Sequence, residues 1–134
     1  NKSFEFKEEL NCKKIHILSN LDTLQTVIEQ SSIIICSYGH LTYEAMALGK
    51  AMCVVAKKNF QLEYAKVLEN KNLCVSAGLI DKLNTIDLKK MLNLTIQKKT
   101  ILEKQAKLNS SKMGLRNISD KLISILDKIN ENQT

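Results

Sequence analysis

Four residues that can contact an anion lie within six positions of one another near the middle of the chain. They are Ser37, Gly39, His40 and Thr42. Two hydroxyls, an imidazole and a glycine, which is expected to take a backbone conformation closed to other residues, suit a phosphate-binding turn. Because helix-forming residues follow directly, the first N–H groups of that helix would add donors. The alternative is an ordinary strand-to-helix turn, and spacing alone favours neither.

Three further polar side chains are expected near this turn. Glu44 lies one turn into the helix on its polar side, where a carboxylate either favours the helix dipole or accepts two ribose hydroxyls. Asn59 and Gln61 flank the start of the next helix, where amides bind sugar hydroxyls or cap the helix. His40 has no evident carboxylate to orient it as a general base, so no catalytic residue is predicted.

Apolar runs on either side position these residues. Ile33–Cys36 is a β-branched run without alternation, typical of a parallel strand buried on both faces. The turn follows it, then a helix to Leu48, then Gly49 and a second apolar run at 52–55. This order predicts one βαβ unit, whose helix begins just beyond the carboxyl end of a strand, where open α/β sheets bind ligands.

The rest of the chain continues the alternation. Short strands are predicted at 15–18 and at 73–75, the latter closed by Gly78. The helix between the second and last strands has its apolar stripe at Phe60, Tyr64, Val67 and Leu68. From Ile86 the pattern is helical, and residues 115–129 keep one apolar face that must be buried across the sheet or against a partner. The predicted fold class is α/β, a Rossmann-like parallel sheet with flanking helices and a long C-terminal helix, in one domain over residues 1–134.

Composition narrows the class of partner. The formal net charge is +6, but Arg116 is the only arginine, aromatics are 4% of the chain and the lysines are spread along it. This pattern favours a solvated lysine-rich surface over a nucleic-acid or membrane patch. The four cysteines form no CxxC pair, and three of them (Cys36, Cys53 and Cys74) lie in apolar runs, which predicts buried, reduced thiols in a cytoplasmic protein. No apolar run is long enough to predict a transmembrane helix, no signal-peptide pattern is found, and no pattern requires a metal or cofactor.

The stretch from Ser32 to Val55, with Asn59-Phe60-Gln61, resembles the C-terminal nucleotide-binding half of GT-B glycosyltransferase-like enzymes (glycosyltransferase family 28 C-terminal type). The resemblance is closest to the UDP-sugar hydrolases of pseudaminic-acid biosynthesis and the related spore coat polysaccharide biosynthesis proteins. The matching residues are Ser37, Gly39, Thr42, Glu44, Leu48, Gly49, Gln61, Ala65 and Leu68, and residues 114–118 resemble the start of the family's terminal helix. The departures are Tyr38 and His40 in place of small residues, Leu41 in place of a common second hydroxyl, Ala51 in place of proline and Tyr64 in place of asparagine.

The resemblance implies roles for six of the seven candidate residues. Glu44 would bind the uridine ribose, Gln61 would reach the sugar, and Ser37, Gly39, His40 and Thr42 would line the pyrophosphate site. The chain would then bind the UDP part of a nucleotide sugar, as the donor half of a UDP-sugar hydrolase or glycosyltransferase in bacterial surface-glycan biosynthesis of the nonulosonic-acid type.

The resemblance also implies missing parts. Two central strands and the N-terminal domain with the catalytic histidine would lie outside this sequence, in a longer parent or a partner subunit, and Asn1 in place of methionine agrees with a fragment. These 134 residues alone are expected to show no turnover. The alternative is a non-catalytic α/β interaction module, or a subunit of a glycosyltransferase complex, that docks through residues 115–129.

Overall fold

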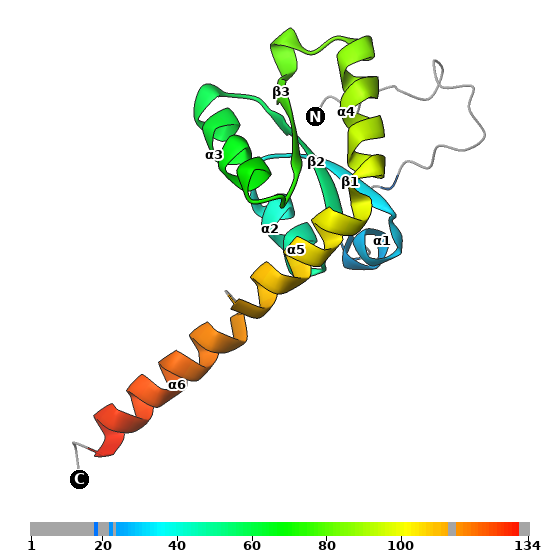
Figure 1. The fold of residues 1–134 in the computed structure, drawn as a ribbon. Helices are drawn as coiled ribbons and strands as arrows, with labels where there is room; N and C mark the ends of the chain where they lie inside the picture. The colour runs from blue at the N-terminus through cyan, green and yellow to red at the C-terminus, as the bar shows by residue number, and fades with distance from the viewer. Residues whose placement is uncertain (1–17, 19–21, 23, 113–114, 132–134) are drawn as a thin grey trace.

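Three parallel strands with helices on both faces form the body of the protein in a computed structural model, which describes residues 18, 22, 24–112 and 115–131 (Figure 1). The strands are β1 (Ile33–Ser37), β2 (Ala51–Ala56) and β3 (Val75–Leu79), adjacent in that order. The helices are α1 (Leu24–Gln30), α2 (His40–Ala47), α3 (Asn59–Asn70), α4 (Thr85–Gln97), α5 (Lys99–Lys112) and α6 (Leu115–Glu131), with a short 3₁₀ helix η2 (Ile80–Lys82) after β3. The predicted α/β class with a parallel sheet and flanking helices is confirmed.

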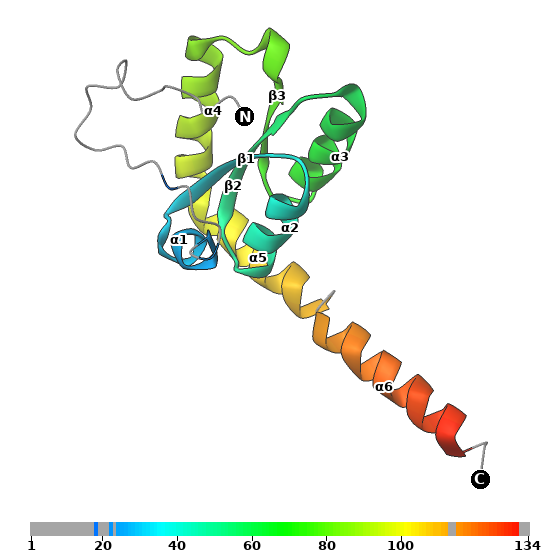
Figure 2. The same ribbon diagram turned by 180° about the vertical axis from the view of Figure 1, so that it is seen from behind.

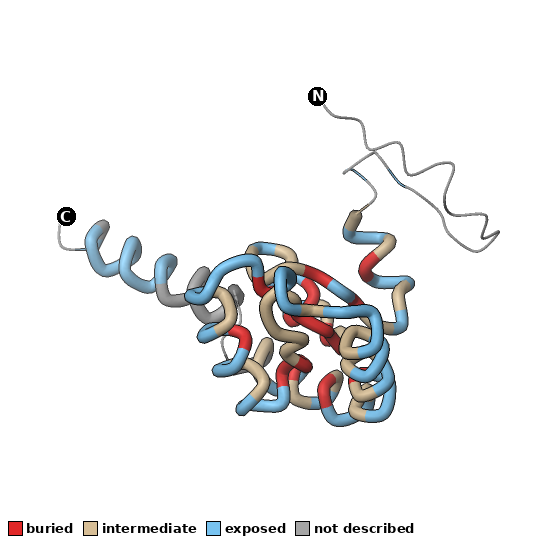
Figure 3. Tube along the Cα trace, turned by 90° about the horizontal axis from the view of Figure 1, so that it is seen from above, coloured by how far each residue is buried: buried red, intermediate tan, exposed pale blue. Residues whose placement is uncertain are grey.

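The helices cover the two faces of the sheet differently. On one face α1, α2 and α3 pack against side chains such as Ile34, Met52 and Val54. On the other face α4 and the start of α5 pack against Ala51 and Val75. Figure 2 shows this layering from behind, and Figure 3 shows from above that the buried positions gather in the interior of the body. The core is therefore two thin apolar layers that fix the strands, and with them the turns at their carboxyl ends.

The two outer strands differ in regularity. The β1–β2 pairing runs without interruption from Ile33 opposite Ala51 to Ser37 opposite Val55. The β2–β3 register shifts between Val54 and Val55, and Gly78 takes a positive φ of 96° next to this bulge. The bulge extends β3 past the glycine, so the expectation that Gly78 closes a strand at 73–75 is wrong.

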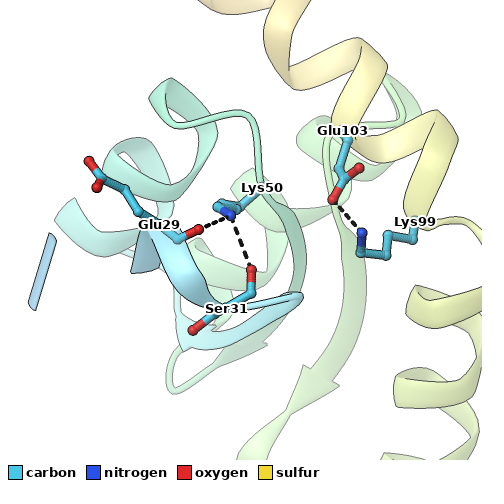
Figure 4. A network of polar contacts seen from close by, with 5 residues as sticks. All are labelled: Glu29, Ser31, Lys50, Lys99 and Glu103. Carbon is cyan, nitrogen blue, oxygen red and sulfur yellow. Dashed lines mark hydrogen bonds and ion pairs between the residues drawn. The ribbon is translucent and has the colours of Figure 1, made fainter. Parts of the chain in front are cut away.

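Lys50 ties the first helix to the sheet. Its ammonium donates to the backbone carbonyls of Glu29 (2.5 Å) and Ser31 (3.1 Å), at the end of α1 and just before β1 (Figure 4). These carbonyls are acceptors that the end of a helix leaves without intrahelical partners. Figure 4 also shows the ion pair of Lys99 and Glu103 on α5, whose side chains are partly exposed.

Two predictions of burial are wrong. Ile35, in the middle of β1, is 51% exposed, because α4 and α5 cover β2 and β3 on that face and extend only to Ile33 on β1. The predicted apolar stripe of α3 is also about half exposed at Phe60, Tyr64 and Val67, while Leu68 packs against the core. The cause is Ala65, whose small side chain is fully buried and brings a neighbouring arc of α3 onto the sheet.

The C-terminal helix α6 leaves its apolar face uncovered, as α3 does in part. The predicted helical stretch after Ile86 divides at Lys98 into α4 and α5. The apolar side chains described on α6 are about half exposed, and Figures 1 and 2 show this helix extending away from the sheet. Packing of α6 across the sheet, one of the two expectations, is therefore not what the structure has. The long C-terminal helix that the sequence predicts after Gly114 stays a prediction.

The predicted strand at 15–18 lies outside the described residues except for Leu18, which is exposed and in no strand.

Candidate functional site

The turn between β1 and α2 is open above its backbone. Gly39 is in an extended conformation (φ 165°, ψ −156°) that any residue adopts, so the predicted need for glycine's conformational freedom is wrong. A Cβ added at Gly39 would meet no atom within 4 Å. Ser37 is half-buried at the end of β1, and His40 is the exposed first residue of α2. By helix geometry the N–H groups of His40 and Leu41, the first of α2, have no intrahelical acceptor.

Thr42 supports the turn from inside. Its side chain is fully buried, and its hydroxyl donates to the Ser37 carbonyl (3.3 Å) and accepts the Gly39 N–H (3.2 Å). The Cys36 sulfur lies 3.7 Å from the same hydroxyl. Thr42 is therefore a positioning residue that closes the turn, and direct contact with a ligand would require it to leave its buried place.

Glu44 is exposed on α2. The helix buries Thr42, Ala45 and Met46, and the helical period places Glu44 on the opposite side. Its carboxylate is thus free to meet a ligand from solvent, one turn beyond the N–H groups of His40 and Leu41. The geometry keeps both sequence-based roles open, the dipole and the ribose contact.

Gln61 joins the two neighbouring turns. Its side-chain oxygen accepts the N–H groups of Lys57 (2.8 Å) and Lys58 (3.2 Å), and its nitrogen donates to the Tyr38 carbonyl (3.0 Å). The oxygen and the nitrogen of the amide both form hydrogen bonds within the protein, so the Gln61 side chain holds the two turns together and does not point to an open sugar site. Asn59 is exposed as the first residue of α3, and Lys58 holds the N-cap position that Asn59 was expected to fill.

Three tyrosines meet at this turn, a cluster that the sequence did not reveal. The Tyr38 ring stacks on Tyr64 (centroids 5.4 Å apart, 11° between planes) and meets Tyr43 edge-on (6.0 Å, 73°). The hydroxyls of Tyr38 and Tyr43 are 2.5 Å apart. Partial burial, and then the hydrogen bond with Tyr43, raise the pKa of Tyr38 to about 12. One signal could have pointed to the cluster: these are all the tyrosines in the chain, and Tyr38 and Tyr43 lie on either side of Gly39 in the sequence.

The cysteines offer no nucleophile at the site. Cys36, Cys53 and Cys74 are buried free thiols, as predicted, and burial raises the pKa of each, that of Cys74 to about 12. A thiol with a raised pKa holds its proton at neutral pH and reacts slowly.

A cavity of about 470 Å³ lies elsewhere, along β3 between α3 and α4. Its charged lining residues are Lys66, Glu69, Lys82 and Asp87. The Glu69 carboxylate accepts the Ser76 N–H at 2.9 Å, which uses one of the two acidic groups. None of the seven predicted site residues lines this cavity, so the candidate site is the open turn.

Within the ranges 24–112 and 115–131, no three His, Cys, Asp or Glu side chains come together as a metal site requires. No helix in the described part of the chain has the length and apolar character to cross a membrane. Comparison with models of protein families, with curated proteins and with solved structures found no match to this chain.

Proposed function

We propose that the chain binds the UDP part of a nucleotide sugar, as the donor half of a UDP-sugar hydrolase or glycosyltransferase in surface-glycan biosynthesis. The observation that supports this most is the open space at Gly39, directly before the first residues of α2. This combination lies at the carboxyl end of a parallel strand, where ligands of open α/β sheets bind.

The pyrophosphate would occupy the open turn. The backbone N–H groups of His40 and Leu41 would donate to its oxygens, and Ser37 and the exposed His40 flank Gly39 in the chain. The positive end of the α2 dipole favours the same charge. Asn59 would approach the sugar from α3.

Glu44 would accept the two ribose hydroxyls. The carboxylate has two oxygens and lies about one helical turn from the phosphate donors, on the same short helix. Thr42 and Gln61 take part indirectly in this arrangement, by holding the two turns in place.

Catalysis would depend on groups outside this chain. We assign no catalytic residue here, and water or a sugar hydroxyl as acceptor would come with a missing N-terminal domain or partner subunit. The three free, buried thiols fit a reducing compartment, so the proposed location is the cytoplasm.

A second candidate function is that of a non-catalytic interaction module. The half-exposed apolar side chains of α6 favour it, because a helix with this face gains its stability from burying it. The two functions differ in whether the protein binds a nucleotide.

Calorimetric titration of UDP into the 134-residue chain separates the two functions. We expect saturable binding that weakens about tenfold in Glu44→Gln, since a charge-assisted pair of hydrogen bonds is lost. Asp81→Asn, which removes an exposed carboxylate from η2, is the matched control and leaves the affinity unchanged.

Absence of UDP binding by a folded chain would refute the proposal and favour the interaction module. Equal affinity of Glu44→Gln and the unmodified chain would remove the ribose contact. Binding that falls steeply with salt and lacks nucleotide preference would indicate a nucleic-acid binder instead.

A further inference from the structure

We propose that the outer face of the Tyr64 ring stacks on the base of the bound nucleotide, with Phe60 beside it. This inference rests on the proposed function, because it names the place of the base in that same site. It assigns a binding role to α3, through residues that the structure leaves exposed where the sequence predicts a buried stripe.

The position of Tyr64 leaves one ring face for a ligand. Its other face packs in parallel on Tyr38, at 5.4 Å between centroids, yet the Tyr64 side chain is still 55% exposed. A third ring laid on the outer face would extend this stack from two members to three. Offset parallel stacking at such spacing is a favourable arrangement for aromatic rings.

The stack is held in place before any ligand arrives. The Tyr38 N–H donates to the Val55 carbonyl, the Tyr38 carbonyl accepts the Gln61 amide, and its hydroxyl pairs with that of Tyr43. Tyr38 thus has partners at its backbone and at its ring, and it presents a fixed support to Tyr64. A flat aromatic group is the occupant that such a rigid ring face accepts best.

The location of the stack relative to the phosphate donors points to a nucleotide rather than to another aromatic ligand. Tyr38 directly precedes Gly39, where a Cβ would meet open space, and the first N–H groups of α2 follow in the chain. A ligand that contacts both features carries a planar ring and an anionic group. Phe60, four residues before Tyr64 on α3 and also half exposed, widens the apolar side of this surface.

The chain provides its own optical reporter for this contact. Tyr38, Tyr43 and Tyr64 are its only tyrosines, and it has no tryptophan. Intrinsic fluorescence therefore arises from this cluster, and a base stacked on Tyr64 should quench it.

The test compares ligands with and without a base. UDP and ribose 5-phosphate are titrated by calorimetry and by tyrosine fluorescence into the unmodified chain and into Tyr64→Ala, Tyr64→Phe and Val67→Ala. Val67 is the control, because it lies on the same exposed face of α3 three residues further on. Far-UV circular dichroism checks that each variant is folded. We expect all of them to fold, because the side chains of Tyr64 and Val67 are about half exposed.

We expect Tyr64→Ala to weaken UDP about tenfold, the loss of one base–aromatic stack, and to leave ribose 5-phosphate unchanged. Tyr64→Phe keeps the ring and should bind UDP as the unmodified chain does. UDP, but not ribose 5-phosphate, should quench the fluorescence.

Unchanged UDP affinity in Tyr64→Ala, with binding still sensitive to Glu44→Gln, would overturn the stacking and leave the proposed function standing. Equal weakening of both ligands would also overturn it, because the ring would then act on the turn and not on the base. Absence of UDP binding by the unmodified chain would refute the proposed function and this inference together.

Discussion

Replacing Thr42 by valine tests how the site turn is held. The substitution keeps the shape of the buried side chain and removes the hydroxyl that joins the Ser37 carbonyl to the Gly39 N–H. Two hydrogen bonds are lost, each contributing about 0.5–1.5 kcal/mol, and their backbone partners stay partly buried. The added methyl recovers up to about 0.8 kcal/mol through burial. We therefore expect Thr42→Val to lower the free energy of unfolding by about 1–2 kcal/mol.

Thr95 provides a matched control. It is the other fully buried threonine among the described residues, and its hydroxyl donates to the Met91 carbonyl at 2.7 Å. The Met91 carbonyl keeps its hydrogen bond within α4 when the hydroxyl is removed. The Cys53 thiol, which also interacts with the Thr95 hydroxyl, is only a weak donor. Thr95→Val should therefore cost less than about 0.5 kcal/mol.

Urea unfolding followed by far-UV circular dichroism measures both variants under one set of conditions. The reasoning holds if Thr42→Val is the less stable of the two by about 1 kcal/mol and also binds UDP more weakly. Equal stabilities, or a larger loss in Thr95→Val, would show that the hydroxyl of Thr42 does not hold the turn together.

Three further predictions concern the scaffold. Gly49→Ala should lower the free energy of unfolding by about 1–2 kcal/mol, because Gly49 has a positive φ of 69°. Gly39→Ala should leave this free energy unchanged, because Gly39 is in an extended conformation. Equal losses of stability in thermal unfolding would contradict this difference between the two glycines. Lys50→Met should cost about 1–2 kcal/mol in urea unfolding, because two carbonyls lose a charged donor, and Lys99→Met less than about 0.5 kcal/mol; the reverse order would be inconsistent with Figure 4. Because burial raises the pKa of Cys74 to about 12 and shifts the other two buried thiols in the same direction, the folded state keeps protons that the unfolded state releases near pH 9. Stability should be complete below that pH and fall as the pH rises toward 12, and a rise of stability over this range in urea titrations would disprove the linkage.

The sequence predicts the βαβ unit around Gly39 well, because its signals are local. The apolar runs fix β1 and β2 to within a residue at each end, and helix-forming residues fix α2. β3 is displaced because Gly78, which indicates a stop in the sequence, takes its positive φ next to a bulge and lets the strand continue. Pairing with β2 decides that outcome, and a single segment cannot show it.

The position of the candidate site in the fold is predictable from the sequence, whereas the contacts within it are not. Ser37, His40 and Glu44 lie at or near the exposed surface of the predicted turn and helix. The role of Gln61 depends on a carbonyl 23 residues away, and the tyrosine stack joins the turn after β1 to α3, which only the folded sheet brings together. Hydrogen bonds and ring contacts between distant segments leave no periodic trace in the sequence.

The amide of Gln61 would also affect the thermodynamics of the proposed nucleotide binding. This one side chain links the loop after β1 to the loop after β2 by hydrogen bonds, so the two loops are already positioned before a ligand binds. The two loops would then lose less conformational entropy when a ligand binds, so fewer contacts would be needed for a given affinity. Shortening this one amide would loosen both loops at once, and binding would acquire the large unfavourable entropy of an ordering transition.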